Sequence, residues 1–224
     1  MPAVTLPAVT VKDLCIDAAD PGRVASFWAG VLGLTAEPRD DGVVPVLDAA
    51  GTPVLWVNPV PEPKVVKNRV HLDLVAADPG PLGTVLAEQD GSTVRADPEG
   101  NEFCVFPGDG APALAALAVD SARPVEIAAW WAGLVGADPV PAPDGTPRWL
   151  SGAAGLAPGV LWKFVPVDDP RTVKNRWHWD VVAEVADLVA AGAVVLREPD
   201  DEIRWTVLED PDGNVFCAFA PPAG

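Results

Sequence analysis

Val66-Lys67-Asn68-Arg69-Val70-His71-Leu72-Asp73 recurs in the second half of the chain as Val173-Lys174-Asn175-Arg176-Trp177-His178-Trp179-Asp180. The two copies contain the only two histidines of the sequence. Each copy is followed by an Asp-Pro-acid-Gly-Asn turn and a Phe-Cys-x-Phe segment, at residues 97–106 and 210–219. Such self-similarity indicates a duplicated module. The 224 residues are therefore predicted to form two modules of about 110 residues each.

The composition indicates a folded protein and argues against two classes of partner. Apolar residues make up 49% of the chain and the mean hydropathy is +0.21, which is ample for a core. The chain has 32 acidic and 15 basic residues, which gives a formal net charge of −17. Such a charge opposes binding to nucleic acid or to an anionic membrane surface. No apolar run approaches the roughly 20 residues of a membrane-spanning helix.

The cysteines and the first residues predict a cytoplasmic protein. The chain has three cysteines, and Cys104 and Cys217 hold equivalent repeat positions between phenylalanines. A small residue in that place is typical of a buried strand position. An odd number of thiols favours a reducing compartment. Met1-Pro2-Ala3-Val4 lacks the basic region of a signal peptide, which agrees with this prediction.

A strand and a capped helix are predicted to open each half. In the first half, a strand over residues 9–16 precedes Asp20, a good N-cap, and Pro21, which suits the first helical turn. The helix ends at Gly33. One apolar helix face is formed by Val24, Phe27, Trp28, Val31 and Leu32. The second half repeats this order with Pro124 and Gly136, but Arg123 replaces the capping aspartate.

Short strands and one further helix are predicted to complete each half. The expected strands of the first half cover residues 43–47, 53–57, 69–75, 93–96 and 102–106. Those of the second half cover residues 148–150, 160–164, 176–182, 203–208 and 215–219. Helices are predicted over residues 82–88 and 185–191. The loops at residues 59–67 and 166–174 are long enough to carry function.

The order of these elements resembles that of a known superfamily. Its signatures look like Asp17-Ala-Ala-Asp20-Pro21 with Phe27-Trp28, residues 67–73, and residues 97–104. Together they resemble the glyoxalase/bleomycin-resistance/extradiol-dioxygenase superfamily, also called vicinal oxygen chelate, and within it the glyoxalase-like domain group. The resemblance covers residues 9–107 and 115–221, with a linker at 108–114. It implies an α+β fold of two tandem βαβββ modules whose curved mixed sheets surround a cavity. The fold hosts enzymes and drug-binding proteins, so it does not determine the activity.

The resemblance also implies where a metal would bind. In the first half the ligand positions correspond to Asp13, His71 and Glu102. Such a set suits divalent iron, manganese, zinc or nickel and leaves room for substrate oxygens. The alternative is a pocket without metal, in which His71 hydrogen-bonds Asp73 or a ligand. In the second half the positions correspond to Ala116, His178 and Val215, and two of these cannot coordinate an ion.

Further ligand contacts are predicted from basic and aromatic residues. Arg69 and Arg176 can clamp a carboxylate or phosphate through the guanidinium fork. Their presence in both halves favours a structural role instead, with an aspartate such as Asp17 as partner. Trp149 and Trp205 are predicted to line a cavity with His178. Aromatic walls of this kind bind planar or cationic molecules.

Two functions follow from these features. One is a metal-dependent lyase, isomerase or dioxygenase acting on a small oxygenated molecule, with Glu102 as metal ligand or as catalytic base. The alternative is a metal-free, drug-sequestering protein with an acidic, tryptophan-containing cavity for a cationic or aromatic compound. Either protein is expected to bind a small molecule, to use neither nucleic acid nor membrane as partner, and to be a monomer or homodimer.

Overall fold

A computed structural model of the chain describes residues 9–78, 80, 82–89, 91–168 and 172–222. The first residues, on which the absence of a signal peptide was predicted, lie outside this part. The chain divides into two compact units. The first unit comprises Asp13–Ala118 and Asn175–Trp177. The second unit comprises the described residues within 1–12, 119–174 and 178–224.

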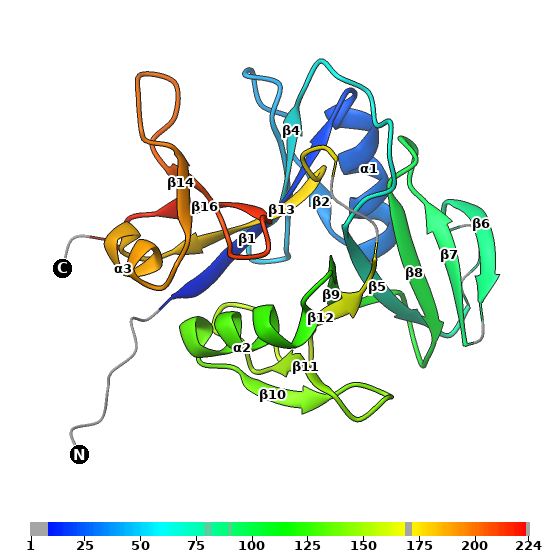
Figure 1. Cartoon of the computed structure of the whole chain (residues 1–224). Helices are drawn as coiled ribbons and strands as arrows, with labels where there is room; N and C mark the ends of the chain where they lie inside the picture. The colour runs from blue at the N-terminus through cyan, green and yellow to red at the C-terminus, as the bar shows by residue number, and fades with distance from the viewer. Residues whose placement is uncertain (1–8, 79, 81, 90, 169–171, 223–224) are drawn as a thin grey trace. The chain divides into compact units, whose positions relative to one another are not determined.

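The elements of each half follow the predicted order closely. The first half forms β1 (Thr10–Ala18), α1 (Pro21–Leu32), β2 (Thr35–Ala36), β3 (Val44–Leu47), β4 (Pro53–Pro59), β5 (Val70–Ala76), β6 (Thr84–Gln89), β7 (Ser92–Ala96) and β8 (Glu102–Pro107). The second half forms β9 (Ala113–Ser121), α2 (Pro124–Val135), β10 (Asp138–Pro141), β11 (Pro147–Ser151), β12 (Leu161–Pro166), β13 (Trp177–Val182), α3 (Val185–Ala190), β14 (Val194–Arg197), β15 (Thr206–Glu209) and β16 (Val215–Phe219). Figure 1 shows their course.

The strands belong to two mixed eight-stranded sheets. Their orders are β14-β15-β16-β13-β1-β4-β3-β2 and β10-β11-β12-β9-β5-β8-β7-β6. Within the first unit, β1 pairs with β4 in parallel, and β5 pairs with β8 in parallel. This is the α+β arrangement of mixed sheets that the sequence predicts.

Local sequence explains where the helices begin and end. The Asp20 carboxylate accepts a hydrogen bond from the Arg23 N–H at 3.1 Å, as an N-cap should. Gly33 ends α1 in the left-handed region with φ 68°, and Gly136 ends α2 in the same way with φ 64°. Arg123 makes no side-chain capping bond to α2, so the weaker second cap is confirmed.

A repeated contact ties each long helix to the Asp-Pro-x-Gly-Asn turn. The Trp28 indole N–H donates to Asp97 Oδ2 at 3.3 Å, and the Trp131 indole N–H donates to Asp210 Oδ2 at 2.9 Å. Both indoles are fully buried. Burial raises the pKa of Asp97 and of Asp210 above the ordinary value, although the hydrogen bonds they accept oppose this. In both halves, therefore, the tryptophan of the helix and the aspartate of the turn form the same buried hydrogen bond.

Aromatic residues fill the core of each unit. In the first unit, the Trp28 ring packs edge-on against Phe103 and Trp177, at centroid distances of 5.2 and 5.3 Å. In the second unit, Trp131 packs against Trp179 at 5.4 Å. Tryptophans 177 and 179 therefore lie against the helices, as predicted from their alternation with His178.

One predicted helix is wrong. Residues 82–88 were expected to be helical, but residues 84–89 form β6, an exposed strand paired antiparallel with β7. Gly83 precedes it with φ 69°, and a Cβ there would lie 2.2 Å from the Ala96 carbonyl oxygen. In Figure 1, β7 and then β6 lie beside β8 at the right of the view. The matching helix of the second half, α3, is confirmed, whereas β2, β10 and β14 were not predicted.

No helix in the described part of the chain combines the length and the hydropathy that a bilayer crossing requires.

Candidate functional site

Three polar side chains come together on β5 and β8 in the first unit. His71 and Asp73 project from the same face of β5, because side chains two residues apart share a face. Cys104 is the direct neighbour of Asp73 in the parallel pairing of β5 with β8. One ligand atom from each of His71, Asp73 and Cys104 lies within 4.8 Å of the other two. These residues are called the His71 cluster below.

The cluster favours a positive charge on the imidazole. His71 Nε2 lies 3.4 Å from Asp73 Oδ1. Burial alone would lower the pKa of His71, but hydrogen bonds to Asp73 and Cys104 and the charges of these groups outweigh burial. The pKa of His71 is raised from 6.5 to about 10. His71 is therefore protonated at neutral pH when no other cation binds to it.

Glu102 lies beside the cluster and is held by a loop. It stands two residues before Cys104 on β8, on the same face of the sheet. Its Oε1 pairs with Lys64 Nζ at 2.8 Å, and its Oε2 accepts from the Asn68 backbone N–H at 3.1 Å. The Asn68 side chain in turn donates to Asn101 Oδ1 at 3.0 Å. Glu102 therefore fastens the β4–β5 connection, residues 60–69, which is called the strap below.

Asp13 lies in a different sheet from the other two predicted ligands. It is buried on β1, whereas His71 and Glu102 lie on β5 and β8. Among the described residues, neither Asp13 nor Glu102 belongs to a group of three His, Cys, Asp or Glu ligand atoms within 4.8 Å. A metal-binding role for these two residues stays a prediction.

The second half keeps the His-x-Asp pattern in a more buried form. On β13, His178 Nε2 lies 3.7 Å from Asp180 Oδ1, and both side chains are almost inaccessible. Asp180 is paired in register with Cys217 on β16, as Asp73 is with Cys104. Ala116 on β9 and Val215 on β16 offer no ligand atom in their side chains.

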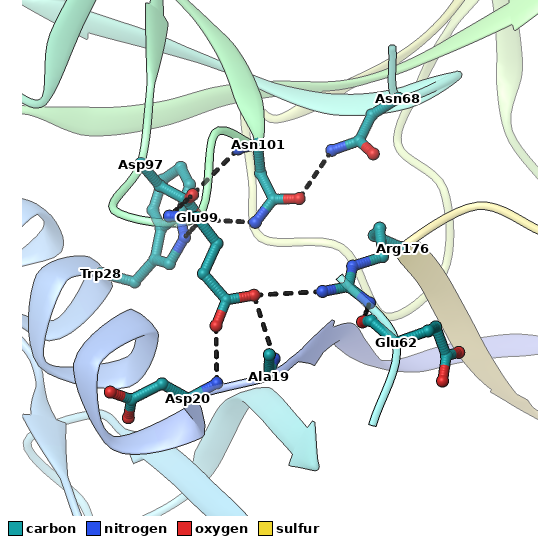
Figure 2. Close-up of polar contacts among 9 residues, drawn as sticks. All are labelled: Ala19, Asp20, Trp28, Glu62, Asn68, Asp97, Glu99, Asn101 and Arg176. Atoms are coloured by element: carbon teal, nitrogen blue, oxygen red, sulfur yellow. Dashed lines mark hydrogen bonds and ion pairs between the residues drawn. The ribbon is translucent and has the colours of Figure 1, made fainter. Parts of the chain in front are cut away.

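Arg176 contacts residues that the sequence did not single out. Its Nη2 donates to Glu99 Oε2 at 3.0 Å, and its Nη1 donates to the Glu62 carbonyl at 2.8 Å (Figure 2). The Glu99 carboxylate also accepts from the backbone N–H groups of Ala19 and Asp20, at 3.0 and 2.6 Å. Arg176 thus pairs with Glu99, a partner that was not predicted from the sequence. Arg69 is half-buried immediately before β5.

The two tryptophans predicted to line a cavity are both half-buried in the second unit. The Lys163 ammonium lies 4.6 Å above the ring of Trp149. The Trp205 ring packs against Phe219 at 5.4 Å, and Lys12 lies 4.6 Å above the Phe219 ring. Aromatic faces in this unit therefore already hold cations of the chain itself.

From the sequence, Asp73 was expected only as a hydrogen-bond partner of His71 in a pocket without metal, and Cys104 was not included in the site, although a signal was present. Alternation places Asp73 beside His71 and Cys104 beside Glu102. What the sequence does not give is the register of β5 against β8, which brings Asp73 and Cys104 together.

The His71 cluster fits a divalent metal ion. Imidazole nitrogen, carboxylate oxygen and thiolate sulfur are the donors that bind zinc, at about 2.0–2.3 Å from the ion. Side-chain rotations can bring three ligand atoms that lie within 4.8 Å of one another onto such an ion. Three protein donors leave a fourth position open, as in catalytic zinc sites.

Comparison with known proteins places both halves in one family. The family model described as "Glyoxalase-like domain" matches residues 13–106 and residues 116–219. A comparison with curated protein sequences found no match.

Solved structures share the fold at low sequence identity. Glyoxalase I from Zea mays superposes with a TM-score of 0.63 and 13% identity, covering 94% of this chain and 92% of that one. The cppA protein from Streptococcus pneumoniae TIGR4 superposes with a TM-score of 0.54 and 10% identity, covering 96% and 99% of the two chains. At these identities the likeness concerns the fold.

Proposed function

The chain belongs to the glyoxalase-like domain family, and from this membership and the His71 cluster we propose that it is a metal-dependent enzyme acting on a small oxygenated molecule. The reaction is a lyase, isomerase or dioxygenase reaction. The observation that carries the proposal is the convergence of His71, Asp73 and Cys104 within 4.8 Å. We retain the expectation of a cytoplasmic monomer or homodimer.

The three cluster residues would hold the ion in the first unit. Zinc, iron, manganese and nickel are the candidates, and the cysteine sulfur favours zinc among them. A bound ion would stabilise an oxyanionic or enediolate-like state of the substrate as a Lewis acid.

The chain's own residues have separate roles in this proposal. Asp73 would be a ligand together with His71 and Cys104, and in the metal-free protein its 3.4 Å contact with His71 keeps these two ligands side by side. Glu102 is the carboxylate nearest to the cluster along β8 and would serve as base or as a further ligand. Lys64 and the Asn68 N–H hold Glu102 beside the site until substrate arrives.

Metal analysis after reconstitution with zinc tests the proposal. We expect about one equivalent of tightly bound zinc in the wild type, and loss of this metal in His71→Ala and Cys104→Ser. Glu198→Ala is the control, because it removes an exposed carboxylate that belongs, among the described residues, to no group of converging ligand atoms, and it should retain the metal. Absence of zinc from the reconstituted wild type would refute the metal site. Equal zinc in His71→Ala would place the ion elsewhere.

A metal-free binding protein is the second candidate. The observation in its favour is that Trp149 and Phe219 in the second unit each accept a lysine ammonium at 4.6 Å. A cationic aromatic ligand would bind by taking the place of a lysine on such a ring. Binding that persists in the presence of a chelator and is weakened by Trp149→Ala would support this candidate.

A further inference from the structure

The strap is fixed to the body of the first unit at several points. The Val60 N–H donates to the Ala18 carbonyl at 2.9 Å, and the Glu62 carbonyl accepts from Arg176. Val65 and Val66 follow these two fixed points and are exposed, and Val65 is the more exposed of the two at 75%. The segment from Lys64 to Asn68 is thus a short loop whose two ends both contact Glu102.

Lys64 and Asn68 form a receptor for one carboxylate. The Lys64 ammonium binds Oε1 of Glu102 at 2.8 Å, and the Asn68 N–H binds Oε2 at 3.1 Å. Each oxygen therefore has its own donor, which is the arrangement that recognises a carboxylate specifically. The side chains of Lys64 and Glu102 are only 13% and 18% exposed, so water weakens this pairing little.

The receptor lies next to the proposed metal site. Glu102 and Cys104 share a face of β8, and side chains at this spacing stand about 7 Å apart. A small organic acid is long enough to place its carboxylate at Lys64 and another oxygen at the His71 cluster. The net charge of −17 would repel such an acid unless a local cation attracted it, and Lys64 is a cation at this point.

We propose that Lys64 and the Asn68 N–H bind the carboxylate of a small organic acid, and that Glu102 occupies their site in the free protein. The assignment of this acid as the substrate rests on the proposed function, whereas the carboxylate site itself does not. The incoming carboxylate would take over both charge-assisted hydrogen bonds that Glu102 accepts in the free protein. The released Glu102 then faces the cluster, where it serves as base or ligand.

Chemical rescue tests the receptor without metal and without the true substrate. In Glu102→Ala, hydrogen exchange at the Asn68 amide should rise about tenfold, because its acceptor is gone. Added acetate should restore protection, whereas acetamide, which has the same shape and no charge, should not. In the Lys64→Met/Glu102→Ala double variant, acetate should have no effect. Rescue by acetamide, or rescue without Lys64, would overturn the proposal.

A binding experiment on the zinc-reconstituted wild type gives an independent test that does not need the Glu102 variant to fold. Pyruvate should bind, and Lys64→Met should weaken its binding about tenfold. The uncharged pyruvamide should bind no better to the wild type than to Lys64→Met. Lys67→Met is the matched control, because it removes the same charge from an exposed position on the strap, and it should change pyruvate binding less than about twofold.

The outcomes separate the two proposals. Acetate rescue in a protein that takes up no zinc would leave the carboxylate site standing and refute the metal-dependent enzyme. Stoichiometric zinc, together with no acetate rescue and no effect of Lys64→Met on pyruvate binding, would refute the carboxylate site and leave the metal-dependent enzyme standing. Equal loss of pyruvate binding in Lys64→Met and Lys67→Met would show general electrostatic attraction and would also refute the receptor.

Discussion

The groups around His71 control the charge of its imidazole. Asp73 and Cys104 hold the pKa of its imidazole at about 10 in the metal-free protein. Because this pKa is raised above the value of 6.5 for an unperturbed histidine, the protonated imidazole stabilises the folded state. That contribution is fully present below pH 6.5 and is lost as the pH rises through 10.

We therefore expect a metal-free NMR titration to show His71 still protonated at about pH 8, and the free energy of unfolding to fall between pH 6.5 and 10. Asp73→Asn should shift the pKa of His71 back toward 6.5, because it removes the partner carboxylate. An unchanged titration in Asp73→Asn would contradict the assignment of this shift to the cluster.

The buried carboxylates of the two turns should have pKa values above the ordinary value of an aspartate. Burial raises the pKa of Asp97 and of Asp210, so each folded turn binds a proton more tightly than the unfolded chain does. The stability gained from this proton is present below pH 3.8 and is lost as the pH rises through the raised pKa. Carbon-13 NMR of the side-chain carboxyls should place both transitions above 3.8, and a value below it for either residue would contradict the prediction.

At the scale of elements, the first helix depends on its cap. Asp20→Ala removes the acceptor for the Arg23 N–H and should cost about 1 kcal/mol in the free energy of unfolding. Asp20→Asn keeps an N-cap acceptor and should cost only a few tenths of that amount. Urea denaturation of the two variants measures the difference, and equal losses would show that the side-chain charge matters more than the cap.

The β6–β7 hairpin requires glycine at its entrance for two reasons. At Gly83 a side chain would meet both an unfavourable φ of 69° and the Ala96 carbonyl 2.2 Å away. At Gly91 the φ of 83° is equally unfavourable, but a Cβ added there would meet nothing within 4 Å. Gly83→Ala should therefore destabilise the protein more than Gly91→Ala, and the reverse order of midpoints in thermal unfolding would contradict this.

Elements with strong local signals were predictable, and elements that depend on neighbours were not. The capped helices α1 and α2 follow from Pro21 and Pro124 near their starts and Gly33 and Gly136 at their ends. Residues 82–88 were predicted as a helix, yet residues 84–89 pair with β7, because strand formation depends on the edge that a neighbouring strand offers. The Asp90-Gly91 pair, a hairpin signal, was the clue to this strand.

At the scale of the whole molecule, the site was predictable in part. The two histidines and the start of β8 were found from the repeat itself. The ligand set taken from the family combined Asp13 with His71 and Glu102, but the strand order puts β1 in one sheet and β5 and β8 in the other. Which strands share a sheet depends on contacts between distant parts of the chain, and the sequence contains no local record of them.

The contact between Arg176 and Glu99 should contribute strongly to the stability of the first unit. Both side chains are nearly inaccessible, and Arg176→Met would leave the Glu99 carboxylate without its cation. We expect a loss of about 3–5 kcal/mol in the free energy of unfolding, as for other buried ion pairs that lose one partner. In the Arg176→Met/Glu99→Gln double variant part of this loss should be recovered, and no recovery would show that Arg176 acts mainly through the Glu62 carbonyl.

The segment Asn175–Trp177 also bears on how this gene can evolve. It is encoded in the second repeat, yet its arginine and tryptophan complete the first unit by contacting Glu99 and Trp28. A fission of the gene between the repeats would deprive the first product of both residues. Separation of the two repeats would therefore remove two contacts from the first unit, which disfavours a split of this reading frame.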